Sequence, residues 1–142
     1  MSLSARHELT WFIVESRERW YRAACRFALQ AFGGDVAIRI VRVNGNAVAG
    51  LVAGAKAARG TVIVCWDLSG AGEDAGSLER FEAVALVRAE VPAAWQIAYL
   101  SPLSPAPWAI AAQEAGISLF LHSLESFPGV AKALARRVYP LG

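Results

Sequence analysis

Asp67 is the residue of this chain whose surroundings point most directly to chemistry. The stretch TVIVCWD, residues 61–67, is apolar nearly throughout and ends on this aspartate. Such a run is typical of a strand that is covered on both faces of a parallel sheet. Functional groups gather at the carboxyl ends of these strands, so Asp67 is a candidate for chemistry that needs a carboxylate. The alternative is that Asp67 only caps the following turn, a common role of aspartate where a chain leaves a strand.

A glycine-rich stretch, GLVAGAKA at residues 50–57, does not fit a phosphate-binding loop. It lacks the GxxxxGK[ST] spacing, and no hydroxyl residue follows Lys56 to bind magnesium. Gly50 and Gly54 lie one helical turn apart, so we expect them to let a helix backbone approach the sheet closely.

A second glycine-rich stretch, GAGEDAG at residues 70–76, follows the third predicted strand and carries Glu73 and Asp74. A pyrophosphate needs positive potential at that point, so we interpret the stretch as a flexible acidic loop. The motifs GxSxG and HExxH do not occur, and His7 and His122 have no neighbours at ligand spacing. The sequence therefore argues against a hydrolase and a metalloenzyme.

The composition predicts one cytoplasmic domain, residues 1–142, with short tails at 1–7 and 140–142. Of the 142 residues, 56% are hydrophobic, which is enough for a core on both sides of a sheet. The net charge of +2 is too small to predict a nucleic-acid or membrane surface. No segment approaches the ~20 apolar residues that span a bilayer. Cys25 and Cys65 lie in apolar stretches and form no CxxC pair, which favours buried reduced thiols.

The first predicted helix carries a stripe of arginines. Arg19, Arg22 and Arg26 fall on one helical face, and Glu18 is placed to pair with Arg22. We interpret the stripe as a solvated face, with contact to an acidic partner as the alternative.

Strand and helix patterns alternate five times along the chain. Apolar or alternating β-rich segments predict strands at 9–15, 36–43, 61–67, 95–101 and 117–122. Helical spacing or runs of small residues predict helices at 16–34, 47–59, 77–90, 105–116 and 127–139. Strands joined by helices of this length pair in parallel through right-handed crossovers. The predicted fold is an α/β three-layer αβα sandwich.

A chain of this pattern with a flavodoxin-like arrangement has a five-stranded parallel sheet of order 2-1-3-4-5. The first and fifth helices would cover one face, and the second, third and fourth helices the other. The first, third and fourth strands are then interior, so we expect the side chains of Ile13, Val62, Val64, Ile97 and Tyr99 to be buried.

Two of the strand ends resemble response-regulator receiver domains. In WFIVESRERWYRAACRFALQAFG, Glu15 and Ser16 stand where receivers carry an acidic pair. In VIVCWDLS, Asp67 looks like the phospho-acceptor aspartate at the end of the third strand. The resemblance covers nearly all of the chain and rests on pattern and spacing more than on identity.

The last two predicted strands carry the same resemblance. In WQIAYLSP, Ser101 stands at the family's Ser or Thr position. The segment EAGISLFLHSL is similar to the family's segment around the fifth strand, where Phe120 matches the aromatic switch position and Ser123 replaces a lysine.

The departures from the family imply a phospho-acceptor pocket that has lost its supporting charges. Receivers, as the resemblance implies, bind Mg²⁺ between the acidic pair and the acceptor aspartate, and their lysine stabilises the phosphoryl oxygens. Here Ser16 and Ser123 replace one acid and the lysine, so no cofactor is expected, and only weak Mg²⁺ binding by Glu15 and Asp67 stays open. The remaining carboxylates leave the pocket negative, and Arg17, just after the first predicted strand, could swing in and neutralise them.

The resulting expectation is that Asp67 lies in a shallow polar pocket with Glu15 and Ser101 and accepts phosphate poorly. A receiver fold without switch chemistry implies a regulatory or scaffolding module that acts by protein–protein interaction and is not an enzyme.

The expected interaction face is formed by the fourth helix, the fifth strand and the fifth helix. Trp108 and Ile110 point about 200° apart on a helix, so the core can bury only one of them well. Lys132, Arg136 and Arg137 would form a polar rim. We expect a protein partner or a homodimer on this face.

Two other classes stay open at this point. One is a working receiver of two-component signalling that is phosphorylated at Asp67, with Glu15 carrying the metal. The other is an unrelated flavodoxin-like or Rossmann-like small-ligand protein or enzyme, because one fold hosts many functions.

Overall fold

The computed structural model describes residues 7–44, 47–68 and 76–139, and strands alternate with helices along it. In chain order the elements are β1 (His7–Val14), α1 (Arg19–Phe32), β2 (Val36–Val43), α2 (Val48–Ala57), β3 (Thr61–Asp67), α3 (Gly76–Glu90), β4 (Trp95–Tyr99), α4 (Ala106–Ala115), β5 (Leu119–Leu121), the 3₁₀ helix η1 (Leu124–Ser126) and α5 (Phe127–Val138). The predicted alternation is confirmed, and the observed ends differ from the predicted ones by a few residues.

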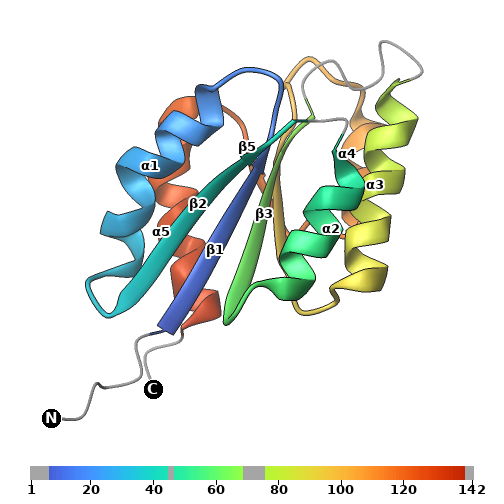
Figure 1. The fold of residues 1–142 in the computed structure, drawn as a ribbon. Coiled ribbons are helices and arrows are strands. Elements are labelled where there is room, and N and C mark those ends of the chain that lie inside the picture. The colour runs from blue at the N-terminus through green and yellow to red at the C-terminus, as the bar shows by residue number, and fades with distance from the viewer. Residues whose placement is uncertain (1–6, 45–46, 69–75, 140–142) are drawn as a thin grey trace, which may run out of the picture.

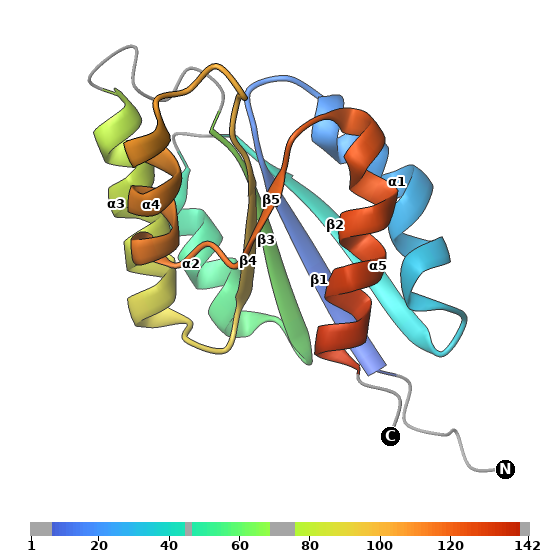
Figure 2. The same cartoon turned by 180° about the vertical axis from the view of Figure 1, so that it is seen from behind.

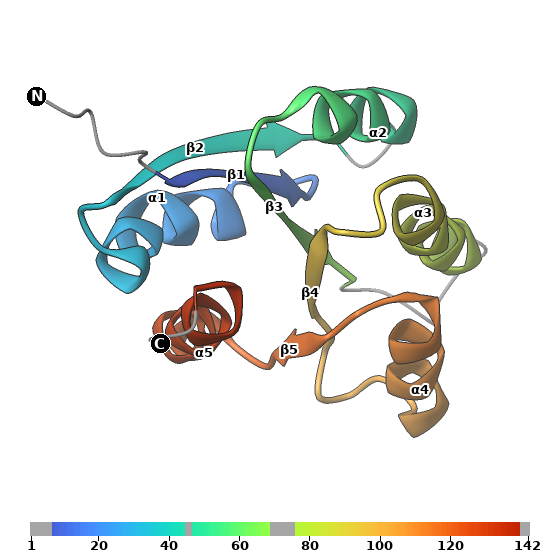
Figure 3. The same cartoon turned by 90° about the horizontal axis from the view of Figure 1, so that it is seen from below.

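The strands form one parallel sheet of order β2-β1-β3-β4-β5 (Figure 1). In Figure 3, α1 and α5 lie on one side of this sheet and α2, α3 and α4 on the other, and Figure 2 shows α4 and α5 from behind. The predicted fold class, strand order and placement of the helices are confirmed. All strands run in the same direction, so Glu15 and Asp67 come at the same end of the sheet.

Two apolar clusters hold the layers together, one on each face of the sheet. Trp66, Val64 and Phe12 belong to the cluster under α2, α3 and α4. Trp11 and Ile13 belong to the cluster under α1 and α5. Alternate residues of each strand point to opposite faces, so both faces of an interior strand must be apolar.

The core positions predicted on the interior strands are mostly confirmed. Ile13, Val62, Val64 and Ile97 are buried. The expectation was wrong for Tyr99, which is half-buried, because it is the last residue of β4, at the carboxyl end of the sheet.

A buried amide joins the sheet to α3. The Gln96 side chain accepts a hydrogen bond from Trp66 Nε1 at 2.7 Å and donates one to the Val84 carbonyl at 3.1 Å. These bonds satisfy polar groups inside the core, where an unpaired group would destabilise the fold.

The C-terminal helix is attached to the beginning of the sheet. The His7 ring lies 4.6 Å from the Tyr139 ring, and the Tyr139 hydroxyl donates to Thr61 Oγ1 at 3.3 Å. His7 was predicted to belong to a tail, but it is the first residue of β1 and pairs with Val36. The predicted tails at 1–6 and 140–142 lie outside the described residues.

Three further expectations have mixed outcomes. Cys65 is buried as predicted, but Cys25 is exposed, because it lies on the outer side of α1 away from the buried Ala24 and Ala28. Gly54 does approach the sheet, since a Cβ atom there would lie 3.2 Å from the Phe12 ring, whereas Gly50 has no atom within 4 Å of that position. The predicted acidic loop at Glu73 and Asp74 lies outside the described residues.

Candidate functional site at the carboxyl end of the sheet

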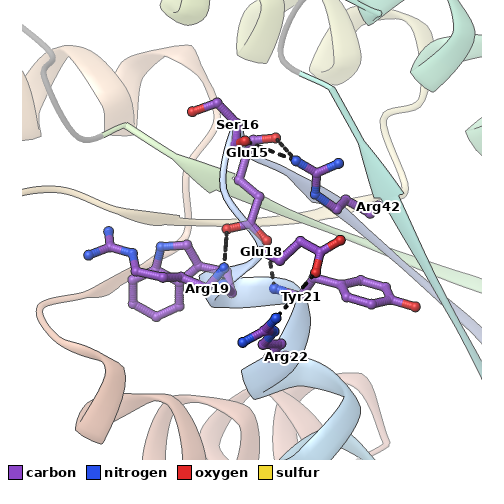
Figure 4. Close-up of polar contacts among 8 residues, drawn as sticks. Glu15, Ser16, Glu18, Arg19, Tyr21, Arg22 and Arg42 are labelled. Carbon is purple, nitrogen blue, oxygen red and sulfur yellow. Dashed lines mark hydrogen bonds and ion pairs between the residues drawn. The ribbon is translucent and has the colours of Figure 1, made fainter.

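Glu15 is buried, and its carboxylate caps the first helix. One oxygen accepts hydrogen bonds from the backbone amides of Arg19 at 3.1 Å and Trp20 at 3.0 Å, and the other accepts from the Tyr21 amide at 2.7 Å (Figure 4). The first amides of a helix have no partner within the helix, and they favour a negative charge. Glu18, the residue before the helix, makes no such side-chain bond. The carboxylate of Glu15 therefore stabilises the start of α1 from the end of β1.

Arg42 of the edge strand holds the backbone beside Glu15. Its Nη2 donates to the carbonyl oxygens of Ser16 at 3.0 Å and Glu15 at 3.4 Å (Figure 4). The side chain of Ser16 itself is exposed. Arg42 thus fixes the turn that leads from β1 into α1, and Ser16 contributes its backbone to that turn.

Asp67 lies beside a cation supplied by α1. Arg19 Nη2 is 3.6 Å from Asp67 Oδ2, and the side chains of the two residues are 41% and 10% exposed. The guanidinium of Arg19 also lies over the rings of Tyr99 at 5.4 Å and Trp20 at 5.7 Å. These contacts hold the cation against the end of β3.

The negative charges of Glu15 and Asp67 both act on the thiol of Cys65. Burial raises the pKa of the Cys65 thiol above its usual range, and the negative charges of Glu15 and Asp67 raise it further. Cys65 is opposite Ile13 in the sheet and precedes Asp67 by two residues, so all these groups lie at one end of the sheet. The structure therefore gathers Glu15, Asp67 and Arg19 into one charged site.

Two of the three serines that the resemblance assigned to the pocket, Ser101 and Ser123, have local roles. Ser101 is half-buried, and its Oγ accepts a hydrogen bond from the Leu103 amide at 3.2 Å. Ser123 is the residue before η1, where its side chain and that of Ser126 form a reciprocal capping box. Both hydroxyl groups therefore stabilise the loops that follow β4 and β5.

Phe120 is half-buried in β5 and packs against the cluster beneath α2, α3 and α4. It pairs with Ala98 of β4. The aromatic switch role that the resemblance assigns to Phe120 stays a prediction.

The two apolar residues of α4 have different surroundings. Trp108 is half-buried, and its ring stacks on Phe81 of α3 with centroids 5.3 Å apart and planes 7° apart. Ile110 is 57% exposed. On α5, the side chains of Lys132, Arg136 and Arg137 are all exposed. The core thus holds Trp108 and leaves Ile110 on the surface.

The cation at the site is not the one that the sequence suggested. Arg17 is exposed, whereas Arg19, which the sequence placed in a solvated stripe, pairs with Asp67. The expected pair of Arg22 with Glu18 is present at 3.7 Å. Arg19 shares one helical face with Arg22 and Arg26, so helical spacing alone could not show that Arg19 has a different role. Glu15 precedes Arg19 by four residues, a spacing that fits an acidic side chain capping the start of a helix. This spacing was the signal in the sequence that could have placed Arg19 near the site.

Magnesium would meet an engaged carboxylate at this site. Both oxygens of Glu15 accept amide hydrogen bonds, so a metal at Glu15 would have to replace the cap of α1. Within the ranges that the structure describes, no group of three or more His, Cys, Asp or Glu side chains could hold a metal ion. No helix among the described residues is long and apolar enough to cross a membrane.

Solved structures with the same fold come from response regulators and pilus assembly proteins. No protein-family model and no curated protein sequence matches this chain. A CheY-like protein, TadZ of Pseudomonas aeruginosa PAO1, has a TM-score of 0.69 at 12% identity, over 94% of this chain and 98% of that chain. A putative pilus assembly protein, CpaE of Burkholderia thailandensis E264, has a TM-score of 0.59 at 16% identity, over 91% of this chain and 98% of that chain.

The REC domain of another protein, RcsB, is similar as well. The isolated REC domain of RcsB from Salmonella enterica serovar Typhimurium, in the apo form, has a TM-score of 0.63 at 13% identity, over 90% of this chain and 86% of that chain. At these sequence identities, the similarity shows the fold alone. The activity must be inferred from the residues of this chain. The chain has the fold of the response-regulator receiver domains.

Proposed function

We propose that the chain is a degenerate receiver, a regulatory or scaffolding module that acts through protein contacts and does not transfer phosphoryl groups efficiently. The observation that carries this proposal is the position of Arg19, whose guanidinium pairs with Asp67 while its backbone amide binds Glu15. One residue thereby engages both carboxylates that the resemblance assigns to the metal and the phosphoryl group.

Three features of the site support this proposal. The Glu15 oxygens are occupied by helix amides, which removes a metal ligand. A serine stands at the position of the family's lysine, so the developing phosphoryl charge would lack that cation. The Arg19 guanidinium is held by Trp20 and Tyr99 next to Asp67, where it already compensates the charge of the carboxylate. A site in this condition suits one permanent state better than a switch between two.

The proposal is tested by exposing the chain to a small phosphodonor with Mg²⁺ and measuring its intact mass. A working receiver treated in parallel is the positive control, and Asp67→Asn is the control for the acceptor residue. We expect the working receiver to gain a phosphoryl group while this chain does not. Prompt modification of the chain that disappears in Asp67→Asn would establish a working receiver instead.

A contact surface for a protein partner is proposed at α4, β5 and α5. Ile110 is 57% exposed on α4, and Leu103, in the loop before α4, is 93% exposed. The exposed Lys132 and Arg136 of α5 provide charges around such an apolar surface. This arrangement of exposed apolar groups with a polar rim is typical of an interaction surface.

The contact surface is tested by Ile110→Asp, with Leu29→Asp as its matched control. Leu29 is 58% exposed on α1, on the opposite face of the sheet, so the two substitutions place the same charge at equal exposure. We expect Ile110→Asp to weaken partner binding and both variants to unfold at about the same denaturant concentration. Equal effects of the two substitutions on binding would contradict this surface.

The proposal also places the chain in the cytoplasm. Cys25 and Cys65 are both free thiols, a state typical of proteins in a reducing compartment.

A further inference from the structure

Helix α2 is apolar on its outer side as well as on its inner side. Leu51 and Ala55 are buried, and Lys56 is the charged residue of the sequence VAGLVAGAKA. Apart from Lys56, the exposed side consists of small residues: Ala49, Gly50, Ala53 and Ala57. A helix at the surface of a monomeric domain normally shows polar residues to water. The composition of α2 is that of a helix with a partner on its outer side.

A groove with a volume of ≈ 770 Å³ runs between α2 and the edge strand β2. Val41 and Val43 of β2, both half-buried, line it on the sheet side. Gly50 and Gly54 line it on the helix side, and a Cβ atom at Gly50 would meet nothing within 4 Å. The groove is therefore open beside a helix whose small residues allow another backbone to approach closely.

The two sides of α2 carry opposite charges. On the side of β2, the groove is lined by the exposed Arg39 and Arg59, by the half-buried Arg42 and by one exposed carboxylate, Glu8, so its charge is mainly basic. On the other side lies α3 (Figure 3), where Glu82 is exposed and Glu90 is paired with Lys56 at 3.4 Å. A basic flank, an apolar helix and an acidic flank thus follow one another across this face.

We propose that this face, formed by the outer side of α2, the groove beside it and the acidic flank of α3, joins two copies of the chain. An isologous dimer brings the same surface of both copies together. If the two-fold axis lies along α2, the basic flank of each copy meets the acidic flank of the other. An axis across α2 would instead oppose like charges.

The charged groups lie within the length of this face and not at its ends. Arg39 lies midway along β2 (Val36–Val43), and Glu82 lies midway along α3 (Gly76–Glu90). A two-fold axis along α2 keeps each group at its own height, so the flank that carries Arg39 in one copy faces the flank that carries Glu82 in the other. The surface is therefore complementary to itself, and the apolar side of α2 is covered by its symmetry mate.

The first test is the oligomeric state of the whole chain, measured by sedimentation at concentrations up to about 200 µM, where even weak dimers are populated. We expect a dimer that Ala53→Glu dissociates, with a dimer dissociation constant raised about tenfold or more. Gln30→Glu, which adds the same charge at an exposed position of α1 on the opposite face of the sheet, leaves the dimer unchanged. A wild-type monomer over this range overturns the proposal.

The second test exchanges the charges. Arg39→Glu alone and Glu82→Arg alone each place like charges across the axis, so each variant is expected to be mainly monomeric. A mixture of the two restores opposite charges at both contacts, and it is expected to form a heterodimer of near wild-type affinity. Failure of the mixture to associate, with both variants folded by circular dichroism, overturns the arrangement.

The third test fixes the orientation. In a Cys25→Ser background, Ala49→Cys and Ala53→Cys lie one helical turn apart on the outer side of α2. An axis along α2 brings each of them near its own symmetry mate, so oxidation cross-links both variants as dimers. Cross-linking of one variant alone, or of neither, contradicts an axis along α2.

This proposal is independent of the partner surface at Ile110. If Ile110→Asp dissociates the dimer while Ala53→Glu does not, self-association uses α4 and the proposal for α2 is overturned. The proposed receiver-like function would stand in that case.

Discussion

Arg19 Nη2 lies 3.6 Å from Asp67 Oδ2, so the charge of the aspartate is compensated by the first residue of α1. The backbone amide of Arg19 donates to the carboxylate of Glu15 in the same turn. The position of α1 therefore determines the charge of the site, because the helix start and the cation are the same residue. Changes that displace this helix start are expected to alter the whole site.

Replacing Arg19 by glutamine is expected to lower the free energy of unfolding by up to about 1 kcal/mol, as the ion pair is partly exposed and its ring contacts are modest. Arg22→Gln, which removes the exposed pair with Glu18, is the matched control and should lower it by less. The measurement is urea denaturation at low salt. Equal losses of unfolding free energy in the two variants would show that the pair of Arg19 with Asp67 stabilises the fold no more than an exposed ion pair.

Glu15→Ala is expected to lower the free energy of unfolding by about 2 kcal/mol or more, because it leaves amides of the first turn of α1 without a partner. Glu15→Gln keeps an acceptor oxygen and should lie between this variant and the wild type. Glu18→Ala serves as the control, since Glu18 makes no cap bond. A Glu15→Ala protein as stable as Glu18→Ala would contradict the capping role.

The thiols are expected to differ in reactivity. Cys25 is exposed, whereas burial together with the charges of Glu15 and Asp67 raises the pKa of the buried Cys65 thiol. The native chain should therefore react with a maleimide at Cys25 alone near neutral pH, and Cys65 should react once the chain is unfolded. Peptide mass mapping of the labelled chain checks this, and rapid native labelling of Cys65 would contradict it.

The raised pKa of Cys65 also predicts a loss of stability in alkali. The unfolded thiol ionises near pH ~8.5, while the folded thiol stays neutral, so the folded state binds more protons above that pH. The contribution of Cys65 is complete below that pH and decreases above it by up to about 1.4 kcal/mol per pH unit. Denaturation at several pH values should show a shallower decline for Cys65→Ala than for the wild type. Parallel declines would contradict this effect.

Gly60→Ala is expected to be strongly destabilising, by about 2 kcal/mol or more, because of backbone strain and a steric clash. Gly60 has φ +78°, and a Cβ atom there would collide with the carbonyl oxygen of Glu8. Gly34→Ala is the control, since a Cβ atom at Gly34 meets nothing within 4 Å. Thermal unfolding of both variants makes the comparison, and similar melting temperatures would contradict the expectation.

The layers of the fold could be predicted because they depend on regular patterns. TVIVCWD is apolar on both of its faces, and this identifies an interior strand before any neighbour is known. The expectation for Cys25 was wrong because it rested on apolar neighbours in the sequence, whereas burial on a helix depends on spacing. Cys25 lies three residues after Arg22 and next to Arg26, on the exposed side of α1.

The charged site was less predictable, because the role of a carboxylate depends on where its side chain points. Glu15 follows an apolar strand, and the sequence does not distinguish a metal ligand from a helix cap at this position. The direction of its side chain depends on where α1 begins. Arg17 and Arg19 differ by two positions, and only the packing of α1 against β3 brings Arg19 to Asp67. Ser101 and Ser123 likewise bind their own loops, an interaction that regular spacing does not reveal.

The contact of Tyr139 with His7 and Thr61 has a consequence for chain connectivity. It brings the first residue of β1 beside the residue that follows α5, at the end of the sheet away from Asp67 (Figure 1). Domains whose ends lie together tolerate insertion into a host loop and circular permutation. Polypeptide attached directly before His7 or directly after Tyr139 would leave from this one corner, away from the carboxyl edge of the sheet. The domain can thus be spliced into another protein as a unit without covering its charged site.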